Sequence, residues 1–186
     1  MQKISAWFHK ISNGKVVLVT LLIFIAFTSL VLPGQAAQAD QFGEEVGTVD
    51  TSMYYTPDQL IEIAEGYGKE GRDAYIRARW TFDVAWPLVY TAFLASATSL
   101  LVKKTIDQYS PWMMLNLVPL FAMLFDFLEN IAASGVMAAY PQKLTWLAWL
   151  SSVFTPVKWL LVGGSFLLVI GLLIALAIKA LGSTSK

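Results

Sequence analysis

The chain has 186 residues, of which 56% are hydrophobic and only 14% are charged, and its 13 basic and 13 acidic side chains give a net charge of zero. Soluble domains carry about 25% charged residues, and long apolar runs account for the deficit here, so the composition predicts an integral membrane protein. The absence of cysteine excludes disulfides and thiolate metal sites, the single histidine, His9, argues against imidazole chemistry, and the balanced charge argues against nucleic-acid binding.

The segment of residues 1–39 has two possible interpretations. A short basic stretch precedes an uninterrupted apolar run over residues 16–32, and Ala37-Gln38-Ala39 follows it. This order is typical of a secretory signal peptide cleaved after Ala39, which is the interpretation we favour. The apolar run is also long enough to cross a bilayer as a permanent first helix. In either case the next segment lies on the extracytoplasmic side.

Residues 40–79 form the longest polar segment, with nine acidic and four basic side chains. Thr56 is a favourable N-cap residue, Pro57 suits the first helical position, and Asp58 suits the first turn. The apolar residues that follow at helical spacing are Leu60, Ile61, Ala64 and Tyr67. The pattern predicts an extracytoplasmic amphipathic helix that ends at the glycines of residues 66–71.

Two membrane spans follow the polar segment. The first covers residues 80–102 and stops at the two lysines of residues 103–104. The second covers residues 111–139, with Ser110 as its N-cap and Pro111 at its first helical position.

The last apolar region covers residues 144–181 and is too long for one untilted crossing, because a span needs about 20 residues. Thr155-Pro156 has the residue types of a helix start. We therefore expect an interfacial helix over residues 144–154 and a separate span over residues 156–181.

The placement of lysine predicts the orientation. The lysines expected on one side are Lys3, Lys10, Lys15, Lys103, Lys104, Lys179 and Lys186. Because cytoplasmic loops are enriched in lysine and arginine, that side should be cytoplasmic. The sequence thus predicts an all-α integral membrane helical bundle over residues 80–186. It would have three spans, or four if residues 1–39 are retained, and would lie in a bacterial inner membrane with residues 40–79 outside and the C-terminus inside.

Several polar side chains occur at one depth in the apolar helices. Asp126, Glu129 and Asn130 share one face of the span over residues 111–139, in its outer half. Charges in a span are costly and therefore face the bundle and pair, so we expect these side chains to meet the polar residues of the neighbouring spans. The resulting polar cluster comprises Arg79, Asp83, Trp86, Tyr90, Asp126, Glu129, Asn130 and Lys158.

Two functions fit the polar cluster. In the favoured one, the charges fix the helix register of a non-enzymatic accessory or assembly subunit that contacts another membrane protein. In the other, the surplus carboxylate Asp126 belongs to an outer-leaflet pocket that binds a small amphiphile, either in a binding protein or in an isomerase-like enzyme. Membrane lipid is an expected partner in both. Neither function calls for a cofactor, and the few oxygen ligands disfavour a metal site.

The layout also resembles a known family. An extracytoplasmic amphipathic helix, followed by a span with an acid one turn before a proline ("FDVAWPLVYTAFL"), is similar to the emopamil-binding-protein-like EXPERA family over residues 54–94. That resemblance implies a four-helix membrane protein that binds sterol-like amphiphiles, with Asp83 as a pocket acid. The chain departs from the family in having no histidine within a span and no acid within residues 16–32. The whole chain also resembles a family of bacterial multi-span membrane proteins, a likeness that implies no activity.

Overall fold

The computed structural model describes residues 1–43, 47–49 and 52–184 of the chain. Within these residues the regular structure is entirely helical, as predicted, and no strand is present. Four of the described helical stretches are long and apolar enough to cross a membrane, namely Gly14–Gln35, Gly68–Thr105, Pro111–Ala139 and Thr145–Gly182. Three acids of the polar segment, Glu44, Glu45 and Asp50, and the last lysine, Lys186, lie outside the described residues.

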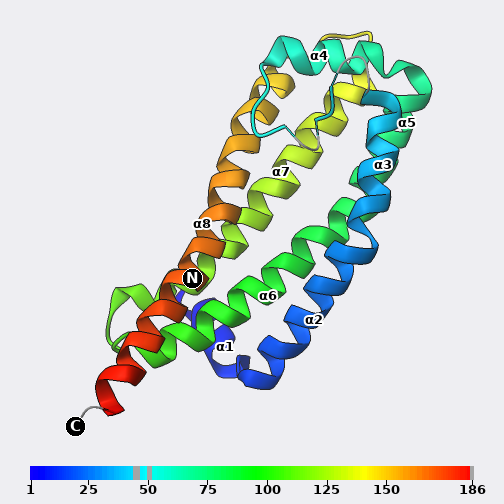
Figure 1. The fold of residues 1–186 in the computed structure, drawn as a ribbon. Coiled ribbons are helices and arrows are strands. Elements are labelled where there is room, and N and C mark those ends of the chain that lie inside the picture. The colour runs from blue at the N-terminus through cyan, green and yellow to red at the C-terminus, as the bar shows by residue number, and fades with distance from the viewer. Residues whose placement is uncertain (44–46, 50–51, 185–186) are drawn as a thin grey trace.

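The described helices form one elongated bundle. In chain order they are α1 (Gln2–Ile11), α2 (Gly14–Leu30), α3 (Leu32–Gly43), α4 (Pro57–Gly66), α5 (Gly68–Arg79), α6 (Phe82–Thr105), the 3-10 helix η1 (Pro111–Leu117), α7 (Val118–Ala139) and α8 (Thr145–Thr184). Figure 1 shows α4 lying across one end of the bundle and α1 near the opposite end. We call these the α4 end and the α1 end.

The amphipathic helix predicted after Thr56 is confirmed as α4. The Thr56 hydroxyl accepts a hydrogen bond from Gln59 N, and the Gln59 side chain accepts one from Thr56 N, which forms a reciprocal capping box. The apolar face of α4 is buried against α7 and the start of α8, with Leu60 and Ala64 fully covered. Gly68 adopts a positive φ of 59°, which lets the chain turn from α4 into α5 without steric cost.

Polar contacts dock helix α1 onto the rest of the bundle. The Ser5 hydroxyl donates to Asn116 Oδ1 at 2.8 Å, and Asn116 Nδ2 donates to Ser99 Oγ at 2.9 Å. Lys103 Nζ donates to the carbonyl oxygens of His9 and Ser12, which lie at the C-terminal end of α1. These contacts join α1 to η1 and α6.

Helix α2 packs on α6 through aromatic rings. Phe24 stacks on Trp86 and Phe93 with ring centroids 5.7 and 5.3 Å apart. One turn later, Phe27 stacks on Phe82 and Trp86. The opposite face of α2 is apolar and exposed, as expected for a helix in contact with lipid.

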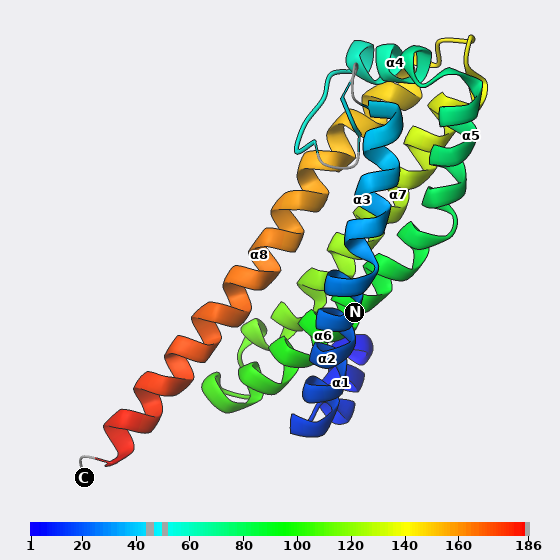
Figure 2. The same ribbon diagram turned by 45° about the vertical axis from the view of Figure 1, so that its right-hand side comes forward.

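The prediction of two helices at the C-terminus was wrong, since α8 runs without a break from Thr145 to Thr184 and contains Pro156. The reason is tertiary packing, because α8 packs on α7 and has a buried face of small residues in the turns that lead up to the proline. Those residues are Ala148, Ser151, Ser152 and Thr155. Figure 2 shows the last turns of α8 projecting beyond the ends of the other helices.

Two other helix boundaries differ from the expected ones. The span expected over residues 80–102 is helix α6, which begins only at Phe82, because Trp80 and Thr81 separate it from α5. The span expected from Pro111 begins with η1, capped by Ser110 as predicted, and becomes α-helical only at Val118. Residues 32–43, which include the expected cleavage site, form helix α3.

Candidate functional site

The first part of the polar cluster lies at the junction of α5 and α6. Arg79, at the end of α5, forms an ion pair with Asp83 in the first turn of α6, and both side chains are buried. The Arg79 guanidinium also donates to Asn130 Oδ1 at 3.2 Å, and Asn130 Nδ2 donates to the Asp83 carbonyl oxygen at 3.3 Å. Asn130 therefore ties α7 to the ion pair that joins α5 and α6.

The second part of the cluster joins α7 and α8. Glu129, which is 1% exposed, forms an ion pair with Lys158 through Oε2. Its other oxygen, Oε1, accepts from Thr155 Oγ1 at 2.8 Å and from the Tyr55 hydroxyl at 3.3 Å. Glu129 thus has partners at both oxygens in a closely packed network.

Tyr55 connects this network to the segment before α4. Its hydroxyl lies 2.6 Å from Ser151 Oγ and 2.9 Å from Thr155 Oγ1. Burial, together with the nearby Glu129 carboxylate, raises the pKa of Tyr55 well above its ordinary value. Tyr55 therefore acts as a neutral hydroxyl that closes the network from the α4 end.

Asp126 has a more open environment than Glu129. Its Oδ2 accepts from the Tyr90 hydroxyl at 3.1 Å, whereas Oδ1 lies 3.9 Å from Lys158 Nζ, beyond normal hydrogen-bond distance. Lys158 is shared with Glu129, which is closer to it. The cluster thus sets two cations against three carboxylates, and Asp126 is the one least closely matched.

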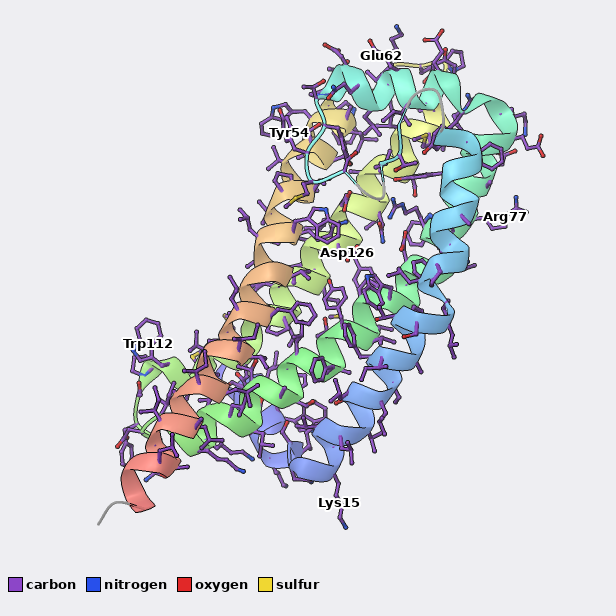
Figure 3. All side chains as sticks on the ribbon, viewed as in Figure 1. Lys15, Tyr54, Glu62, Arg77, Trp112 and Asp126 are labelled. Carbon is purple, nitrogen blue, oxygen red and sulfur yellow. The ribbon has the colours of Figure 1, made fainter. Side chains whose placement is uncertain are left out.

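A cavity of about 810 Å³ reaches Asp126. Its polar lining includes Arg79, Asp83, Asp126 and Lys158, and its aromatic lining comprises Phe42, Tyr67, Tyr75, Phe82, Trp86, Tyr90 and Trp159. The lining also includes Leu32 and Gln35 of α3 and Val162 of α8. Figure 3 shows Asp126 in the space between α7 and α8 on one side and α3 and α6 on the other.

The cavity also reaches the protein surface. Arg77 and Thr81, at the junction of α5 and α6, line it and are exposed. Arg77 projects outward from α5 in Figure 3. The cavity therefore combines buried charged groups, many aromatic side chains and exposed residues that a molecule from outside can approach.

The structure brings the charged and polar residues of the predicted cluster into the pairs described above, and Trp86 meets the Tyr90 ring edge to face at 5.8 Å between centroids. Most of them line the cavity, whereas Glu129 and Asn130 contact the lining residues from behind. Sequence reasoning missed Tyr55, Ser151, Thr155 and the whole contribution of α3. Ser151 and Thr155 do share a helix face with Lys158 by their spacing, but that signal is visible only if the helix continues through Pro156.

Among the described residues no group of three or more His, Cys, Asp or Glu side chains is arranged to hold a metal ion. Comparisons of the chain with protein-family models, with curated proteins and with solved structures gave no match. The chemistry of the site therefore has to be inferred from its own geometry.

Proposed function

We propose that this protein binds a membrane amphiphile in the cavity that reaches Asp126. The observation that carries the proposal is the lining, in which many aromatic and aliphatic side chains are combined with a few charged groups. Ligand sites typically enclose about 300–1,000 Å³ and combine an apolar lining with a few convergent polar groups, and the present cavity fits that description. The resemblance of residues 54–94 to the EXPERA family agrees with this function.

The proposed topology places the α1 end in the cytoplasm of a bacterium and the cavity in the outer half of its inner membrane. The contacts of Lys103 with α1, and of Lys179 with the Lys104 carbonyl oxygen, support this orientation because they gather lysines at one end of the bundle. Retention of residues 1–39 as a permanent helix is part of the proposal, since Leu32 and Gln35 line the cavity. The intact mass of the protein purified from membranes tests that retention.

The main test compares the thermal stability of wild type and Asp126→Asn, each as the purified full chain, with a panel of membrane lipids and sterol-like amphiphiles. Asparagine keeps the size of the side chain and removes its charge. We expect at least one compound to raise the unfolding temperature of wild type and to have little effect on the variant. Asp73→Asn is the matched control, because Asp73 is an exposed carboxylate on α5 that pairs only with Lys69 among the described residues.

An accessory or assembly subunit is the second candidate, and the closely packed network around Glu129 supports it. In that case the whole cluster would serve stability alone. Asp126→Asn would then lower the unfolding temperature, and no compound would shift either protein. That result would overturn the ligand-binding proposal.

A further inference from the structure

Helix α1 turns polar residues towards the protein and leaves apolar residues exposed. Ser5 is buried and donates to Asn116, and the His9 ring contacts carbonyl oxygens of α6 and η1. Trp7 and Ile4, in contrast, are 54% and 48% exposed. A helix with such an exposed apolar face is suited to the boundary between lipid headgroups and acyl chains.

Exposed lysines border the apolar face of α1. Lys3 precedes Trp7 by four residues and Lys10 follows it by three, so the two lysines flank the indole ring along the helix. Both lysines are exposed, and neither forms an ion pair among the described residues. Tryptophan is enriched at the headgroup level of membranes, and lysine is enriched on their cytoplasmic side.

The positive charge of the α1 end is not balanced by acids. Lys15 projects from this end in Figure 3, and Lys104 is also exposed. Lys103 and Lys179 donate to backbone carbonyl oxygens, which do not neutralise their charge. In the part of the chain that the structure describes, Asp107 is the single acid at this end. The α1 end therefore attracts a negatively charged partner.

We propose that α1 lies in the membrane interface and binds the anionic headgroups of phospholipids such as phosphatidylglycerol. Lys3 and Lys10 contact the phosphates, while Trp7 and Ile4 lie against the start of the acyl chains. These exposed apolar side chains beside the lysines favour a bilayer over an acidic soluble protein. The inference does not depend on the amphiphile-binding cavity, because none of these residues lines it.

The test uses the full chain in phosphatidylcholine vesicles that contain equal shares of either phosphatidylglycerol or phosphatidylcholine brominated on the acyl chains. Brominated lipids quench the fluorescence of a tryptophan that they contact. Subtracting the signal of Trp7→Phe, made in each variant, isolates the contribution of Trp7. We expect stronger quenching by brominated phosphatidylglycerol, and we expect added salt to weaken this preference because the lysines are exposed.

Lys3→Gln/Lys10→Gln removes two of the charges and keeps the apolar face. The preference for phosphatidylglycerol should fall roughly fivefold for each lysine that lies at the headgroups. Lys69→Gln/Lys143→Gln is the matched control, because it removes two exposed lysines from the α4 end. It should leave the preference at Trp7 unchanged.

Three results would overturn the proposal. The first is equal quenching of wild type by the two brominated lipids. The second is a preference that survives in Lys3→Gln/Lys10→Gln or falls as much in the control. The third is no quenching of Trp7 by either lipid, which would place α1 in water and leave its lysines to an acidic soluble partner. None of these results bears on the comparison of wild type with Asp126→Asn, so the two proposals can fail separately.

Discussion

Replacing Glu129 with glutamine would leave Lys158 as a buried cation without its closest counter-charge. The two residues are 1% and 7% exposed, so water cannot readily take the place of the carboxylate. Glutamine keeps a side-chain oxygen that can accept from Thr155 and Tyr55. The substitution therefore removes the charge with little change in shape.

Two reference values can be used to estimate the loss in free energy of unfolding. An average interhelical hydrogen bond in a membrane protein contributes only about 0.6 kcal/mol. Removing one partner of a buried ion pair costs about 3–5 kcal/mol, because the remaining charge is stranded. The second value applies to Lys158, although Asp126 Oδ1, at 3.9 Å, offsets part of the loss. We expect the free energy of unfolding to fall by about 2–3 kcal/mol.

Reversible unfolding of the full chain in mixed micelles with increasing dodecyl sulfate, followed by circular dichroism, would measure this loss. The double variant Glu129→Gln/Lys158→Met removes both charges and should recover to within about 1 kcal/mol of wild type, since buried pairs can often be replaced by apolar groups at little cost. A single-variant loss near 0.6 kcal/mol, the value of an ordinary interhelical hydrogen bond, would refute the reasoning. A double variant no more stable than the single one would refute it equally.

Three further predictions use the same preparation. Thr56→Ala removes the N-cap of α4 and should lower the free energy of unfolding by about 1 kcal/mol, and no change would show that the contact with Gln59 is not stabilising. Asn116→Leu removes the hydrogen bonds to Ser5 and Ser99 and should speed amide hydrogen exchange in α1, whereas unchanged exchange would show that α1 docks without them. Because burial raises the pKa of Tyr55 above its unfolded value of about 10, the folded state keeps the proton longer. Stability should therefore fall as pH rises above 10, and it should fall less steeply in Tyr55→Phe; equal slopes would contradict this.

The meeting of the charged side chains was predictable from local information. The spacing of Asp126, Glu129 and Asn130 places them on one helix face, and the cost of an isolated charge in an apolar helix requires partners at the same depth. Lys158 and Arg79 were the cations within reach at that depth. The helical spacing of these residues and the free-energy cost of an isolated charge in an apolar helix were together sufficient to predict the cluster.

The cavity and its wall were not predictable in the same way. The wall includes Leu32 and Gln35, which belong to a segment whose composition also fits a signal peptide cleavage region. Tyr55 reaches Glu129 although the two residues are 74 positions apart in the sequence. The continuity of α8 depends on its packing against α7, which outweighs the local signal of Pro156. All three features arise from contacts between segments far apart in the sequence.

The unbroken course of α8 has a consequence for how the protein would fit bilayers of different thickness. A helix of 40 residues is about 60 Å long, about twice the 30 Å apolar core of a typical bilayer. Its first half packs on α7, and its second half packs on α6 through Val169 and Leu172 and is tied to the end of α6 by the hydrogen bond from Lys179 to the Lys104 carbonyl oxygen. A thinner or thicker membrane would therefore be accommodated by a change in tilt of the whole bundle. The cavity, which contacts α8 only around Lys158 to Val162, would keep its shape when the membrane composition changes.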